Sequence, residues 1–143
     1  MREYELWGFR LEIDGDATKQ WYDGAEEWGC ECGHCRNFLV LARNRRLPAP
    51  VLEILDMLCI PPEKATYVCQ MVEKEDGQLY EFSYRIAGNI LSGKTDKTVP
   101  QSWGEGICRH EIYPYGAPGF PQPHFDLEFW ITLPWVLDEK ETG

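Results

Sequence analysis

Alternation of apolar and polar residues marks the start of the chain. Trp7, Phe9, Leu11 and Ile13 occupy every second position, which is the period of a half-buried strand. We therefore predict a strand over about residues 3–13, ended by Asp-Gly-Asp at 14–16. Residues 17–33 show no sustained period and contain several glycines, so we interpret them as irregular.

A helical period follows from residue 34. Phe38, Leu41 and Ala42 recur at three- and four-residue spacing, which predicts a helix over about 34–45. Leu-Pro-Ala-Pro at 47–50 ends it. Pro50 suits the first turn of a second helix, whose apolar stripe is Val51, Ile54, Leu55 and Leu58. Pro61 and Pro62 end that helix, so Cys59 falls at its C-terminal end, and the two helices form a hairpin over about 34–59.

Strand-like alternation returns after the helices. We predict a strand over about 66–73, a turn at 75–77 with Gly77, and a return strand over about 80–86. A polar stretch after Gly93 reads as a loop, a further strand is predicted over 107–113, and 114–124 is a loop rich in proline and glycine. Strict alternation over 125–133 predicts a closing strand. The fold class is α+β: one domain, residues 1–143, with an antiparallel sheet packed against the two-helix hairpin.

Composition narrows the classes of partner. The formal net charge is −10, from 24 acidic and 14 basic residues, and the clearest local basic cluster is Arg43, Arg45 and Arg46. Nucleic-acid binding requires a basic face, so we expect no nucleic-acid partner. No apolar run reaches the roughly 20 residues of a membrane span, and we expect no membrane partner. An unidentified protein partner is compatible with the acidic surface.

The N-terminal segment does not have the pattern of a signal peptide, so we expect a cytoplasmic protein. Thiols stay reduced in the cytoplasm, where clustered cysteines indicate metal or redox chemistry more often than disulfides.

The cysteine motif lies at residues 30–35. Cys32 and Cys35 have the Cys-x2-Cys spacing that brings two sulfurs to one zinc ion, and Cys30 stands two residues earlier. A fourth ligand is needed, for which the candidates are His34, His124, Cys69 and the pair Cys108 and His110. Residues two apart in a strand point to the same side, so we favour this pair. The predicted zinc ligands are Cys30, Cys32, Cys35 and His110.

Two other interpretations of the motif stay open. In the first, Cys35 lies in the first turn of a helix as a thiolate of low pKa, and Cys32 is its resolving partner. In the second, the cysteines are buried and inert. The spacing matches neither ferredoxin pattern for an iron–sulfur cluster.

None of the familiar enzyme motifs occurs in the sequence. A non-enzymatic binding or accessory module is therefore favoured, with a thiol-based redox protein or enzyme as the alternative. In a further hypothesis the aromatic-rich loop at 113–125, with Tyr115 and Phe120, is a docking surface for a partner.

Four segments together carry a resemblance: Cys-Glu-Cys-Gly-His-Cys-Arg-Asn-Phe at 30–38, the helix end at 58–65, the aromatic stretch at 80–93 and the segment 127–137. The chain resembles, over about residues 5–137, a family of small bacterial and phage-associated proteins with a Cys-x-Cys-x2-Cys-x-Asn-Phe motif. Such proteins tend to have glycine where this chain has Cys59, which removes Cys59 from any shared site. The family has no established activity, so the resemblance supports the fold and leaves the function open.

Overall fold

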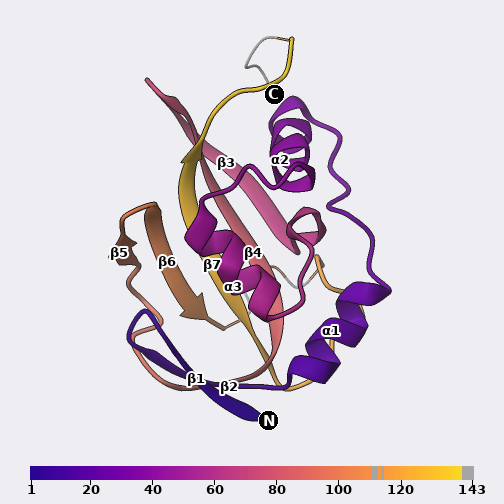
Figure 1. Ribbon diagram of the computed structural model, residues 1–143, viewed down its shortest axis with the longest axis vertical. Helices are drawn as coiled ribbons and strands as arrows, with labels where there is room; N and C mark the ends of the chain where they lie inside the picture. The colour runs from indigo at the N-terminus through magenta and orange to yellow at the C-terminus, as the bar shows by residue number, and fades with distance from the viewer. Residues whose placement is uncertain (111–112, 114, 140–143) are drawn as a thin grey trace.

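The structure is a computed structural model that describes residues 1–110, 113 and 115–139. In these residues the sheet has seven antiparallel strands, in the order β1-β2-β4-β7-β6-β5, with β3 also paired to β4. The strands are β1 (Arg2–Leu6), β2 (Phe9–Ile13), β3 (Tyr67–Lys74), β4 (Gly77–Ser92), β5 (Val99–Gln101), β6 (Gly104–Arg109) and β7 (His124–Leu133). The helices are α1 (Gly15–Asp23), α2 (Gly33–Arg43), α3 (Ala49–Met57) and the short 3-10 turn η1 (Pro62–Lys64). The predicted α+β class is confirmed (Figure 1).

The long strand β4 is the centre of the sheet. It pairs with β7 along one edge over residues 78–87, and on its other edge with β3 near its start and β2 near its end. The predicted hairpin at 66–86 and the closing strand at 125–133 are confirmed. Since β4 continues to Ser92, the predicted return strand is correct but too short.

One face of β4 and β7 carries the apolar core. Tyr80, Phe82 and Tyr84 are fully buried on this face, and Phe38 of α2 packs on Phe82 with ring centroids 4.9 Å apart. Val51 and Leu55 of α3 are also fully buried. Figure 1 shows α2 and α3 in front of the sheet. The two helices begin and end within a few residues of the predicted positions, whereas their packing together as a hairpin stays a prediction.

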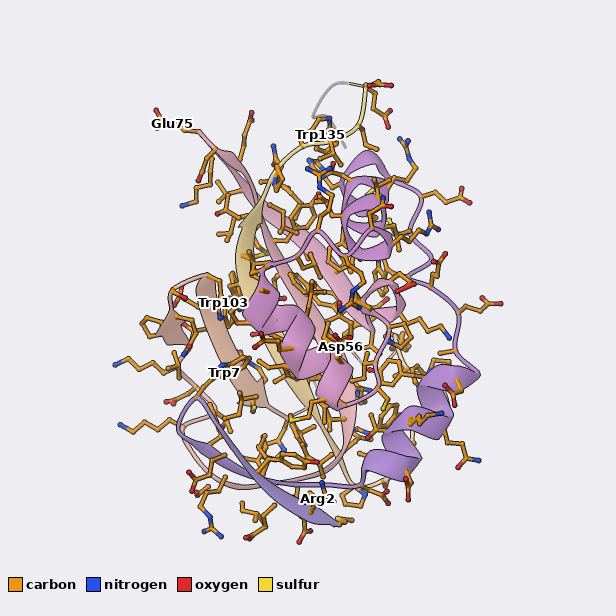
Figure 2. All side chains as sticks on the ribbon, in the orientation of Figure 1. Arg2, Trp7, Asp56, Glu75, Trp103 and Trp135 are labelled. Carbon is orange, nitrogen blue, oxygen red and sulfur yellow. The ribbon has the colours of Figure 1, made fainter. Side chains whose placement is uncertain are left out.

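The predicted N-terminal strand over 3–13 is wrong as a single strand. It is a hairpin, in which β1 and β2 pair through a two-residue turn at Trp7 and Gly8. Both residues have positive φ, 54° and 86°, as a tight hairpin turn of this kind requires. The turn folds over the core face, where Trp7 packs on Trp103 and Phe129 with ring centroids 5.8 and 5.5 Å apart (Figure 2).

The irregular interpretation of residues 17–33 is wrong over its first part, which is helix α1. The Asp14 side chain caps the helix by accepting a hydrogen bond of 3.0 Å from the Ala17 N–H. Thr18 and Tyr22, four residues apart, face β4: Thr18 Oγ1 accepts from the Ala87 N–H, and the Tyr22 hydroxyl donates to the Arg85 carbonyl. In the sequence, Asp14 followed by Thr18 and Tyr22 at four-residue spacing was already a pattern typical of a capped helix.

The remaining predictions in the C-terminal half differ in detail. The polar stretch after Gly93 contains the short strand β5, and β6 begins at Gly104 and ends at Arg109, before the predicted end at 113. Residues 111 and 112 lie outside the described residues. In the described part of the chain, no helix is both long and apolar enough to cross a membrane.

The second face of the sheet is polar but partly buried. Arg85 of β4 and Asp126 of β7 form an ion pair on this face, each side chain about 3% exposed. Arg85 also donates to the Tyr113 carbonyl at 3.0 Å. Tyr113 therefore lies over this face, and its ring packs on Trp28 of the linker from α1 to α2.

Candidate metal centre

The linker from α1 to α2 leads the chain to the cysteine motif without regular structure. Trp28 anchors it, since the backbone N–H of Trp28 donates to the Glu63 carbonyl of η1 at 3.1 Å. The Trp28 ring packs on Tyr67 and Tyr113, with both centroid distances 6.2 Å. Glu27 is held by Arg43 of α2, whose Nε donates to Glu27 Oε2 at 2.9 Å. These contacts determine where Cys30 begins the motif.

Cys30, Cys32 and Cys35 come together as predicted. Their three Sγ atoms all lie within 4.8 Å of one another. Cys30 is exposed, Cys32 is half-buried and Cys35 is buried, so the group runs from the surface into the protein. In a tetrahedral zinc site with Zn–S bonds of about 2.3 Å, the sulfurs are about 3.8 Å apart. A contraction of about 1 Å or less would therefore fit these three thiolates around zinc.

Two N–H groups point at the sulfurs. Cys32 is the N-cap of α2 and its Sγ accepts from the Cys35 N–H at 3.5 Å. The Trp28 indole N–H donates to Cys35 Sγ at 3.2 Å. N–H donors and the positive end of a helix stabilise thiolates, which are the form of cysteine that binds metal.

The pKa values of the two helix cysteines move in opposite directions. Burial alone would raise the pKa of Cys32, but the Cys35 backbone N–H and the Cys30 thiol lower it, and the net shift is downward. Burial raises the pKa of Cys35 well above its usual range, although the Trp28 N–H opposes this shift. The redox alternative requires the opposite order, with the lowered pKa at Cys35 and Cys32 as the resolving partner.

The group of three does not include a fourth protein ligand among the described residues. His110 is exposed. Because β6 ends at Arg109, the strand geometry that would place His110 on the same side as Cys108 ends one residue before His110. Cys108 itself is fully buried beside the core, and burial raises the pKa of its thiol to about 12. His110 as fourth ligand stays a prediction.

The other candidate ligands have contacts elsewhere. The His34 ring packs on Trp135, with centroids 5.7 Å apart. His124 Nε2 lies 3.0 Å from the Gln122 amide nitrogen. The Cys69 thiol donates to the Gln70 carbonyl at 3.6 Å.

The role of Trp28 was not predicted. For Asn37 the sequence favours an ordinary polar residue early in the helix over a hydrogen bond to a loop carbonyl or to the cysteine turn. Asn37 is fully buried; its amide donates to the Pro134 carbonyl at 3.0 Å, and its Oδ1 accepts from the Val136 N–H at 2.8 Å. It fastens α2 to the segment after β7, so the less favoured interpretation, a hydrogen bond to a loop carbonyl, is the correct one. The position of Trp28, two residues before Cys30, was the available signal for its role.

Comparison of the chain with models of protein families, with curated proteins and with solved structures finds no match.

Proposed function

We propose that the protein is a non-enzymatic binding or accessory module in which Cys30, Cys32 and Cys35 hold a structural zinc ion. The observation that carries the proposal is the approach of the three Sγ atoms to within 4.8 Å of one another at the start of α2. Zinc there would join the irregular linker to the helix. Because zinc binds the folded arrangement, its binding free energy adds to the stability of the fold.

The surface supports the same proposal. A net charge of −10 opposes binding to nucleic acid. The described basic side chains Arg43 and Arg45 are paired with Glu27 and Asp56, so this predicted basic cluster is largely neutralised. Six free cysteines suit the reducing cytoplasm that we propose as the location.

The proposal is tested by elemental analysis of the native protein and by melting curves before and after dialysis against a strong chelator. We expect about one equivalent of zinc, and a melting temperature lower by roughly 10 °C or more after chelation. Cys32→Ser should lose the metal, whereas Cys59→Ser, at an exposed cysteine outside the group, should retain it. A metal-free native protein with an unchanged melting curve would overturn the proposal.

The fourth ligand is tested on the same samples. If His110 binds the ion, His110→Ala weakens zinc binding and changes the visible spectrum of the cobalt-substituted protein. An unchanged cobalt spectrum would remove His110 from the site.

The redox alternative makes a different prediction. A thiolate at Cys35 would be alkylated fast at a pH well below 8.5. Because Cys35 is buried and its pKa is raised, we expect slow labelling of Cys35 in the native protein. Fast labelling of Cys35 at neutral pH would favour the redox alternative.

A further inference from the structure

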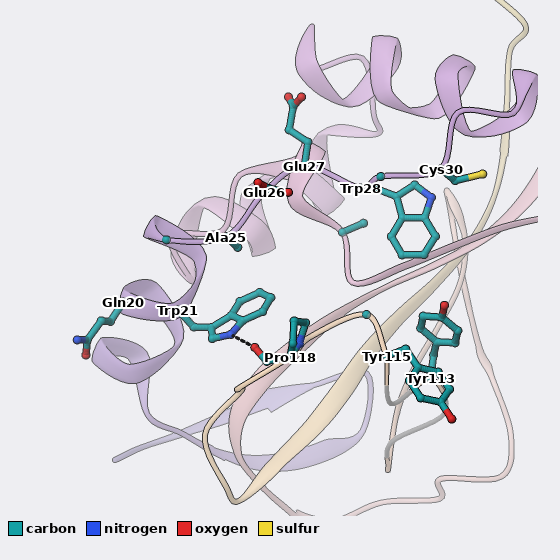
Figure 3. A pocket seen from close by; sticks show the side chains of 14 residues that line it. Gln20, Trp21, Ala25, Glu26, Glu27, Trp28, Cys30, Tyr113, Tyr115 and Pro118 are labelled. Atoms are coloured by element: carbon teal, nitrogen blue, oxygen red, sulfur yellow. Dashed lines mark hydrogen bonds between the residues drawn. The ribbon is translucent and has the colours of Figure 1, made fainter.

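A groove of about 860 Å³ lies between α1, the linker to α2, and Tyr113 with the loop residues 115–118. Figure 3 shows Trp21 and Trp28 on two sides of it, with Ala25 and Glu26 along the linker and Pro118 and Tyr115 along the loop. Cys30 lines the end of the groove nearest to the cysteine group. The groove therefore borders the metal centre, with which it shares Cys30 and Trp28.

The two tryptophans present their rings to the groove. The Trp21 indole N–H donates to the Pro118 carbonyl at 3.1 Å, and the Trp28 indole N–H donates to Cys35 Sγ at 3.2 Å. Both polar groups are thus used within the protein. The Trp21 ring packs on Tyr22 and Phe120, and the Trp28 ring packs on Tyr67 and Tyr113. Each tryptophan is half-buried, so it offers the groove the part of its ring that these neighbours leave uncovered. Tyr115 adds a third ring and is 80% exposed. Aromatic ring faces attract cations, Arg and Lys side chains above all.

The charge of the groove favours the same ligand. Glu26 lines it and is exposed, and Glu26 forms no ion pair with another described residue. The neighbouring Glu27 is neutralised by Arg43. The described lining residues include no Lys, Arg or His, and the chain carries a net charge of −10. A cation would therefore meet aromatic faces and a carboxylate, while the Lys64 ammonium lies outside the lining and donates to the Tyr22 carbonyl at 2.6 Å.

We propose that this groove binds an extended, arginine-containing segment of a partner protein, with a guanidinium group between the aromatic rings and Glu26. The planar guanidinium stacks on aromatic rings and pairs with carboxylates, and both partners are present here. The groove is open and larger than a single side chain needs, which favours a peptide segment over a free small amine. The inference rests on the proposed binding role and does not depend on the metal.

The test uses isothermal titration of the full chain with a short peptide of alternating glycine and arginine. The comparison peptide has citrulline in place of arginine, which keeps the shape and removes the charge. We expect micromolar binding of the arginine peptide and no detectable binding of the citrulline peptide. Glu26→Gln and Tyr115→Ala should each weaken binding by roughly two- to fivefold, the usual size of one exposed cation–π or ion-pair contact.

The matched control is Glu75→Gln, which removes one negative charge at the β3–β4 turn, far from the groove (Figure 2). Equal losses in Glu26→Gln and Glu75→Gln would show attraction by net charge alone and overturn the proposal, as would equal binding of the two peptides. Zinc is measured in the same samples. If the native protein carries zinc but does not bind the peptide, only the groove proposal is overturned. If the native protein binds the peptide but carries no zinc, only the metal-site proposal is overturned.

Discussion

Trp28 belongs to both proposed sites. Its ring forms a wall of the aromatic groove, packed on Tyr67 and Tyr113, and its indole N–H donates to Cys35 Sγ. A donor of this kind orients a metal ligand and stabilises its thiolate form. The N–H and the ring can be separated experimentally, because phenylalanine retains an aromatic ring and lacks the donor.

For Trp28→Phe we expect zinc affinity to fall by about 10- to 100-fold, the usual effect of losing a hydrogen bond to a metal ligand. Competition with a fluorescent zinc chelator measures the change. Trp103→Phe is the control, since Trp103 packs on Trp7 and Phe129 across the core face. Equal zinc affinity in Trp28→Phe and the native protein would show that the bond to Cys35 does not support metal binding.

At the scale of elements, the pairing of β2 with β4 requires that the two backbones approach closely. Gly88 in β4 pairs with Ile13 of β2 and has a φ of 147°. A Cβ atom at this position would lie 1.9 Å from the Glu12 carbonyl oxygen, which belongs to the backbone and cannot turn aside. Glycine is therefore required where the N-terminal hairpin joins the sheet.

We expect Gly88→Ala to lower the free energy of unfolding by about 3 kcal/mol or more, because it adds a steric clash to an unfavourable φ. Urea unfolding measures the loss. Gly15→Ala is the control, since a Cβ atom there meets no atom within 4 Å; it should be neutral or slightly stabilising. Similar stabilities for the two variants would contradict this account of the pairing between β2 and β4.

At the scale of the whole molecule, the polar face of the sheet makes stability depend on pH. Burial, together with the negative charge of Glu128 on β7, raises the pKa of Glu81 on β4 to about 7, although Arg109 on β6 opposes the shift. Between about pH 4.5 and 7, Glu81 therefore holds a proton in the folded state, whereas in the unfolded chain its pKa is near the ordinary 4.5 and the proton is released. The stabilising contribution of protonated Glu81 is complete below about pH 4.5 and is lost as the pH rises through about 7.

Glu81→Gln stays neutral at every pH, so it should not show this loss. We expect the melting temperature of the native protein to decline relative to that of Glu81→Gln between about pH 4.5 and 7.5. Glu73→Gln, at an exposed position of β3, should keep the native pH dependence. Parallel curves for the native protein and Glu81→Gln would exclude a protonated Glu81 in the folded state.

The sequence by itself determined the elements whose pattern is local. Alternation over 125–133 and 80–86 identified the two central strands, because neighbouring side chains in a strand point to opposite faces. Apolar residues at three- and four-residue spacing, bounded by prolines, located α2 and α3, and Cys-x-Cys-x2-Cys at a helix start predicted that the three sulfurs lie together. Trp7 was misassigned because one positive-φ turn reverses the chain without changing the alternation around it.

Only the tertiary structure decided the features that join distant segments. Arg85 alternates with apolar residues as a solvent-facing residue would, yet it is buried, donates to the Tyr113 carbonyl and pairs with Asp126. Trp28 reaches Cys35 and Tyr67 through a linker that has no period of its own. The aromatic groove arises between segments about 90 residues apart, as the bond from Trp21 to Pro118 shows. A sequence pattern specifies which way a side chain points within its own element, whereas burial, pKa and grooves depend on which other segment covers it.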